Sequence, residues 1–145
     1  MYGDTAVGRK RVAQLRERAD DIRSLAERLV AQSESVPWHG RAAEAMRTRI
    51  KERATHLRAA AEQHDVAANA LDKHLGAVDE TKGAIEEREH KGATLVEEAT
   101  ARVAATRGED GAPTVDPSDE DSAVLAFNAP PSGHKDWLTV ELPGL

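Results

Sequence analysis

The stretch Ser33-Glu34-Ser35-Val36-Pro37-Trp38-His39-Gly40 separates two long proline-free segments that both have a strong helical pattern. Pro37 pushes the residue before it out of helical dihedral angles, and Gly40 gives the backbone freedom where the next segment starts. A connection this short favours antiparallel packing of the segments on either side. The sequence therefore predicts a helical hairpin whose turn lies at residues 36–40.

The segment at about residues 4–35 carries apolar residues with the alternating three- and four-residue spacing of a heptad repeat. The stripe consists of Val12, Leu15, Ala19, Ile22, Ala26, Leu29 and Ser33, six of which are apolar. On the charged opposite face, Asp20 lies three residues before Arg23, a spacing that allows an ion pair. We therefore predict one amphipathic helix over this segment.

The second segment, at about residues 41–107, continues the pattern and fits two architectures. Its stripe is Ala43, Met46, Ile50, Ala54, Leu57, Ala61, His64, Ala68, Leu71, Leu75 and Val78. An unbroken register without proline favours a single long helix. Three glycines at positions 76, 83 and 92 favour a break near residues 76–83, because each costs about 1 kcal/mol in a helix interior. Either way, the first helix is expected to pack antiparallel on residues 41–72.

The composition favours closely packed helices over a bulky globular core. The chain has 145 residues, of which 26 are alanine and only four are aromatic. Alanine is the best helix former, and small side chains let helix axes approach closely. The absence of cysteine excludes a disulfide framework, a thiol nucleophile and a cysteine zinc site.

The formal net charge of −6 is concentrated in one part of the chain. Residues 108–145 carry −7, whereas residues 1–38 carry +1 and residues 39–107 are neutral. A neutral helical body has no basic footprint for nucleic acid. No apolar run is long enough to span a membrane, and no apolar h-region precedes Arg9-Lys10-Arg11. We therefore expect no nucleic-acid partner, no membrane span and no cleaved signal peptide.

The polar residues show no pattern typical of a catalytic or metal centre. None of the six histidines lies four residues from another on one helix face, and no glycine-rich phosphate loop or nucleophile–base arrangement is present. His64 falls on the apolar stripe, where we expect it to hydrogen-bond across the hairpin or to reach its edge. A two-helix rod also offers little concavity for a substrate. We therefore expect no enzyme activity, no metal and no cofactor.

Residues 108–145 contain five of the six prolines and the acidic run 119–121, which predicts a disordered acidic tail. Two short apolar patches interrupt it, at residues 124–127 and 137–142. The second patch has strand-like alternation. The patches fit either a loosely docked tail or a linear recognition segment. The recognition residues would be Phe127, Trp137, Leu138, Val140, Glu141 and Leu142.

Trp38-His39-Gly40 stands in the turn, and an alanine-rich stretch, residues 41–46, opens the second helix. Over about residues 4–80 this arrangement resembles the WXG family, the helical-hairpin proteins of ESX/type VII secretion. The resemblance implies a hairpin that dimerises into a four-helix bundle. The partner would be a second copy, another helical hairpin or the helical domain of an effector. It also implies that Trp38 and Gly40 contribute to a surface engaged by the secretion machinery.

The chain departs from the family pattern in two ways. The family often carries Tyr-x-x-x-Asp/Glu just after the second helix, but the only tyrosine here is Tyr2. Trp137 and Glu141 have the same spacing, although they lie in the tail. The predicted helical region also extends about 25 residues beyond the usual end of the family. These departures favour a secretion-associated adaptor, or a partner of a chain that carries the signal, over a minimal secreted substrate.

Association of hairpins is also expected from the residues alone. Leu25, Val30, Val66 and Leu95 flank the stripe and would stay exposed on a two-helix rod, and an isolated hairpin buries little area. A four-helix bundle would cover such positions. The predicted partner-binding residues are Leu15, Ile22, Leu29, Met46, Ile50 and Leu57, together with Trp38 and Gly40. The sequence thus predicts a protein that is cytoplasmic, or secreted without a cleaved signal; the alternative is a cytoplasmic coiled-coil scaffold or adaptor unrelated to secretion.

Overall fold

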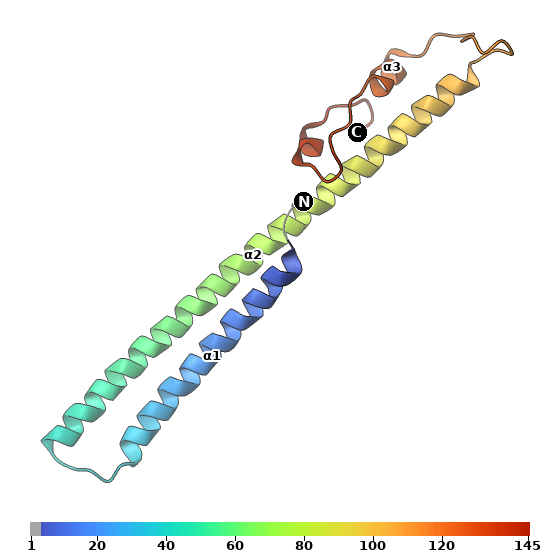
Figure 1. Cartoon of the computed structure of the whole chain (residues 1–145). Coiled ribbons are helices and arrows are strands. Elements are labelled where there is room, and N and C mark those ends of the chain that lie inside the picture. Colours follow the sequence, from blue (N-terminus) through green and yellow to red (C-terminus); the bar gives the residue numbers. More distant parts are fainter. Residues whose placement is uncertain (1–3) are drawn as a thin grey trace. The chain divides into compact units, whose positions relative to one another are not determined.

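A computed structural model describes residues 4–145, and the described chain is helical with no strand. Its elements are α1 (Thr5–Ser35), α2 (Arg41–Ala105), α3 (Asp119–Leu125) and the short 3₁₀ helix η1 (Lys135–Thr139) (Figure 1). The described residues form two compact units, 4–77 and 78–145, and α2 contributes to both. Tyr2, whose position bears on the export motif, lies outside the described residues.

The ends of α1 are set by local chemistry. The side chain of Asp4 accepts a hydrogen bond from the backbone N–H of Ala6 at 2.9 Å, which satisfies one of the free donors of the first turn. After Ser35, Val36 is extended with φ −73° and ψ 121°, as its position before Pro37 requires. Gly40 has φ 103°, a conformation that favours glycine. The predicted first helix and the turn at 36–40 are confirmed.

Helix α2 is continuous over 65 residues, from Arg41 to Ala105. The break considered near residues 76–83 is therefore absent, and the single long helix is confirmed. A Cβ atom added at Gly76 or Gly83 would meet nothing within 4 Å. These two glycines weaken the helix without serving a close contact. The helix nevertheless continues without a break on both sides of these two glycines.

The hairpin core is a row of mostly small buried residues, which we call the alanine seam; apart from Ala43, its members on each helix are spaced seven apart. On α1 the buried residues are Val12, Ala19 and Ala26; on α2 they are Ala43, Ala54, Ala61, Ala68 and Leu75. Most of the larger residues of the predicted stripe, such as Leu15, Ile22 and Leu57, are only half-buried, and Met46 is exposed. Small side chains at the seam let the two helices pack closely. The predicted antiparallel core is confirmed, and it extends beyond residue 72 to Leu75.

Cross-hairpin ion pairs report the same antiparallel register. Arg16 pairs with Asp72 at 3.2 Å, and Arg23 pairs with Glu62 at 3.5 Å and with Asp65. Further along α1, Glu34 pairs with Lys51 at 3.1 Å. The partner positions on α2 fall as the positions on α1 rise, which is the arrangement of an antiparallel pair (Figure 1).

The expectation of a disordered tail at residues 108–145 is wrong for the described structure. Residues 119–125 form α3, residues 135–139 form η1, and the side chains of Val124 and Trp137 are buried. The strand-like alternation of residues 137–142 does not correspond to a strand, because its first residues belong to η1. This order comes from specific contacts between these residues and the second part of α2. In that part of the helix the buried positions Ile85, Gly92 and Ala99 are again seven residues apart.

Candidate interaction surfaces

The turn of the hairpin presents a group of exposed apolar side chains. Val36 is 50% exposed, Trp38 is 48% exposed and Met46 is 51% exposed. Together with Ser33, Ala43 and Arg47, these side chains line a hollow of about 100 Å³. Large apolar side chains in one exposed group are typical of an interaction site, whereas scattered ones are ordinary. Of the predicted site residues, the turn therefore brings Trp38 and Met46 together, next to Gly40.

Arg47 fixes the backbone of the turn. Its guanidinium donates from Nε to the carbonyl oxygen of Ser33 at 3.0 Å, and from Nη2 to those of Val36 and Trp38 at 2.9 and 2.8 Å. Carbonyls at the end of a helix lack intrahelical partners, and a guanidinium offers several donors in a fixed plane. The Trp38 backbone is therefore held while half of the side chain stays exposed. The role of Arg47 could not be predicted from the sequence, since nothing in the local pattern distinguishes it from the other arginines of α2.

The six predicted interface residues lie along the hairpin without forming one cluster. Leu15, Ile22, Leu29, Ile50 and Leu57 are half-buried beside the alanine seam, and Met46 is exposed near the turn. Among the flanking residues, Leu25 is 41% and Val66 is 52% exposed, whereas Val30 and Leu95 are half-buried. Apolar surface thus remains uncovered along both helices. Association through these residues stays a prediction.

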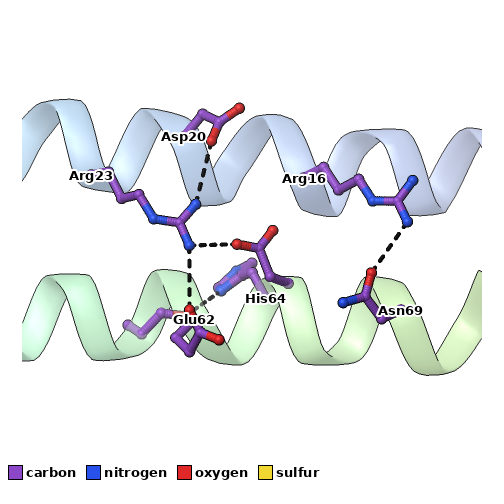
Figure 2. Close-up of polar contacts among 8 residues, drawn as sticks. Arg16, Asp20, Arg23, Glu62, His64 and Asn69 are labelled. Atoms are coloured by element: carbon purple, nitrogen blue, oxygen red, sulfur yellow. Dashed lines mark hydrogen bonds and ion pairs between the residues drawn. The ribbon is translucent and has the colours of Figure 1, made fainter.

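One edge of the hairpin is polar, as Figure 2 shows. Arg16 donates to Asn69 at 3.2 Å, and Arg23 donates to Asp20 at 3.3 Å, which is the ion pair expected from their spacing. The hydrogen bond to Asp65 raises the pKa of the Arg23 guanidinium, and nearby carboxylates add to this. These side chains are partly exposed, so the pairs contribute modest stability. Their main consequence is to fix the register of the two helices.

The His64 ring does not hydrogen-bond across the hairpin, which was one of two expected arrangements. Its Nδ1 lies 2.9 Å from the carbonyl oxygen of Ala60, one turn earlier in the same helix (Figure 2). The side chain is half-buried at the edge of the hairpin, so the second expected arrangement is the one present. Within residues 4–145, no group of three or more His, Cys, Asp or Glu side chains is arranged to hold a metal ion.

A second surface lies in the unit formed by residues 78–145, where Trp137 packs on α2. The side chain of Trp137 is 3% exposed, and its indole N–H donates to the carbonyl oxygen of Pro131 at 3.2 Å. A Cβ atom at Gly92 would lie 2.8 Å from the indole ring, so only glycine leaves room for the ring there. The Phe127 ring meets Trp137 edge-on at 6.0 Å. The missing side chain at Gly92 on α2 therefore leaves a space that the indole ring of Trp137 occupies.

Two side chains of α2 hold the residues around Trp137 by polar contacts. Arg88 donates to the carbonyl oxygens of Trp137 at 2.7 Å and Val140 at 2.5 Å. The Glu89 carboxylate accepts from the backbone N–H of Gly133 at 2.9 Å. Hydrogen bonds from the Ser132 side chain and from that N–H lower the pKa of Glu89, because they favour its ionised form.

Further along α2, Arg102 holds α3. Its guanidinium contacts both carboxylate oxygens of Asp121, with distances between 2.7 and 3.2 Å. This contact lowers the pKa of Asp121 and raises that of Arg102. The side chain of Ser118 caps α3 by accepting from the N–H of Asp121 at 3.1 Å. The roles of Arg88, Glu89 and Arg102 could not be predicted from the sequence, because their partners lie far away in the chain.

The predicted recognition residues of the tail have different surroundings. Trp137 is buried, and Phe127, Val140 and Leu142 are half-buried, whereas Leu138 and Glu141 are exposed. In the structure Trp137 packs on α2, and a role of these residues in recognition stays a prediction. A partner that recognised Trp137 itself would meet a side chain already packed on α2.

No helix within residues 4–145 has both the length and the apolar character needed to cross a membrane. Comparison of the chain with protein-family models, curated proteins and solved structures finds no match. The resemblance to the WXG family therefore rests on the residues of the turn and of the two helices that it joins.

Proposed function

We propose that this chain acts by helix–helix association, as a WXG-like substrate or targeting partner of type VII secretion. The turn carries this proposal. Arg47 holds the backbone around Trp38 in one conformation, while 48% of the Trp38 side chain stays exposed. Tryptophan is enriched among the residues that dominate binding energy at interfaces. An exposed tryptophan on a fixed backbone can bind a partner without first being ordered.

The composition of the hairpin core supports association with a second hairpin. Most of the buried residues between α1 and α2 are alanines, which remove little apolar area from water. The half-buried rows beside the seam would complete their burial in a four-helix bundle. The partner would be a second copy, another helical hairpin or the helical domain of an effector. The polar edge at Arg16 and Arg23 would stay outside the new interface.

Export and partner binding can be tested together in the source cell. The chain is co-expressed with its neighbouring open reading frames, and both the culture supernatant and the co-purified proteins are analysed. We expect Trp38→Ala to reduce export and partner recovery by at least tenfold, and Trp38→Phe to restore part of both. His39→Ala, at an exposed neighbouring position, is the matched control and should behave like the wild type.

The outcomes separate this proposal from its alternative. Unchanged export and binding in Trp38→Ala would exclude a role of the turn in secretion. Partner binding without any export would instead favour the cytoplasmic scaffold or adaptor. Light scattering could instead show a stable monomer at micromolar concentration, both for the chain alone and for the chain mixed with the products of the neighbouring open reading frames. That result would exclude both the secretion role and the scaffold or adaptor.

A further inference from the structure

A groove of about 430 Å³ lies between α2 and residues 118–145, which we call the C-terminal segment. The lining includes Gly92, Ala93 and Val96 of α2 and the rings of Phe127 and Trp137 from the C-terminal segment. All of these residues belong to the unit formed by residues 78–145. Pockets that hold small molecules measure about 300–1,000 Å³ and are mostly apolar, with a few polar groups that orient the ligand. The groove therefore has the size and the lining of a small-molecule site.

The charged groups of the groove are negative. Among the described residues, Glu89 and Glu97 are the only charged side chains that line it. Hydrogen bonds from the Ser132 side chain and the Gly133 N–H lower the pKa of Glu89 and keep its carboxyl ionised. Glu97 is exposed and has no hydrogen-bond or ion-pair partner within residues 4–145. A ligand that is complementary to this groove in charge therefore carries a positive group.

The aromatic rings of the groove favour the same sign of charge. Phe127 meets Trp137 edge-on, with ring centroids 6.0 Å apart and an angle of 66° between the ring planes. Phe127 is half-buried, so part of its ring is open to a ligand. The face of an aromatic ring attracts a cation that lies within about 6 Å of its centroid. Rings and carboxylates thus act together against a carboxylate or phosphate ligand.

We propose that this groove binds a small amphiphilic organic cation, which is an amine or ammonium compound with an apolar body. The apolar body packs against Val96 and Phe127, and the cationic nitrogen lies beside the carboxylate of Glu97. The apolar contacts provide affinity, and the charge of the groove selects among ligands of similar shape. This site is independent of the proposed role in secretion, since none of its residues belongs to α1 or to the turn.

The test compares three compounds that share one apolar body and differ in the charge of the head group: phenylbutylamine, phenylbutanol and phenylbutanoate. Equilibrium dialysis against the full chain measures binding at about pH 7, where the amine is protonated. We expect the amine to bind with a dissociation constant of about 1 mM or tighter. The alcohol should bind about tenfold more weakly, because it lacks the ion pair and the attraction of the rings. The carboxylate should not bind at about 10 mM.

Variants of α2 identify the groove as the site. Ala93→Leu places a larger side chain in the groove and should weaken binding of both the amine and the alcohol by about tenfold or more. Ala84→Leu, at an exposed position outside the groove, is its matched control and should change neither. Glu97→Gln should weaken binding of the amine about threefold and leave that of the alcohol unchanged. Its matched control is Glu87→Gln, which is also exposed and outside the groove.

Several results would overturn the proposal. One is an amine that fails to bind at about 10 mM. Another is an alcohol that binds as tightly as the amine, because the groove would then not select a positive charge. Unchanged binding to the Ala93→Leu chain would mean that the amine binds outside the groove. Unchanged binding of the amine to the Glu97→Gln chain would remove the ion pair on which the proposed selectivity depends.

Discussion

Substituting alanine for Gly92 should have opposite effects on α2 and on the segment that packs against it. Alanine favours a helix interior over glycine by about 1 kcal/mol. At Gly92, however, the new Cβ would lie 2.8 Å from Cζ3 and 3.2 Å from Cη2 of Trp137. The ring is held by its hydrogen bond to Pro131, so it cannot shift freely. Overpacking of this kind typically costs about 1–3 kcal/mol, which would weaken docking of the C-terminal segment about 5- to 150-fold.

Gly83→Ala is the matched control, since a Cβ there meets nothing within 4 Å. Both variants are made with Trp38→Phe, so that Trp137 is the only tryptophan. Helix unfolding in urea is followed by far-UV circular dichroism, and burial of Trp137 by its emission and by its access to a soluble quencher. We expect Gly83→Ala to stabilise the helix and leave Trp137 buried, and Gly92→Ala to keep the helix but expose Trp137.

The contact between Gly92 and Trp137 is refuted if the two variants behave alike. Equal stabilisation, with Trp137 buried in both, would mean that the indole ring does not occupy the space at Gly92. Exposure of Trp137 in both would mean that its docking depends on the flexibility of α2 and not on the missing side chain.

Three further predictions concern the turn, the seam and the effect of acid. Arg47→Ala should lower the free energy of unfolding in urea by about 1–3 kcal/mol, because three carbonyls lose a charged donor; an unchanged midpoint would mean that water replaces it. In thermal unfolding, Ala61→Leu should lower the free energy of unfolding by about 1–3 kcal/mol, because the larger side chain overfills the seam. The exposed control Ala60→Leu should change it by less than about 0.5 kcal/mol. Equal losses of stability in the two variants would contradict the close packing. The pKa values of Glu89 and Asp121 are lowered in the folded chain, so their stabilisation is complete above the ordinary carboxyl range and is lost as the pH falls below about 4. In the Trp38→Phe chain, Trp137 emission should therefore report undocking in acid, and a pH-independent signal would contradict this.

The hairpin could be predicted from the sequence because its signals are local. Pro37 and Gly40 mark the turn, and the three- and four-residue spacing of apolar positions marks each helix over many repeats. The sequence predicts less about which residues of the stripe are packed between the two helices. The stripe contains both the alanines and the larger residues such as Leu15 and Leu57, and the sequence does not say which set faces the partner helix. The structure places the alanines at the seam, since small side chains are the ones that permit a close approach.

The docked C-terminal segment shows why composition misleads for a region held by a few specific contacts. Prolines and acidic residues raise the average tendency to disorder, but docking depends on particular pairs. Trp137 fills the space at Gly92, 45 positions earlier, and Asp121 meets Arg102. Gly92 interrupts an apolar stripe, so by itself it indicates only a weakened helix. Trp137 by itself indicates only an apolar motif.

Considered together, these two residues carry information that neither has alone. A glycine on the buried stripe of a helix leaves a hole the width of a side chain, and a large aromatic residue elsewhere needs a place to be buried. Gly76 and Gly83 do not lie on the buried stripe, and no side chain approaches either of them. Gly92 is buried on the stripe, and Arg88 and Glu89 lie within one turn of it, where they bind the backbone on both sides of Trp137. The buried glycine, the two charged side chains beside it and a distant tryptophan therefore identify this docking position together, whereas the acidic composition of the tail says nothing about which pairs meet.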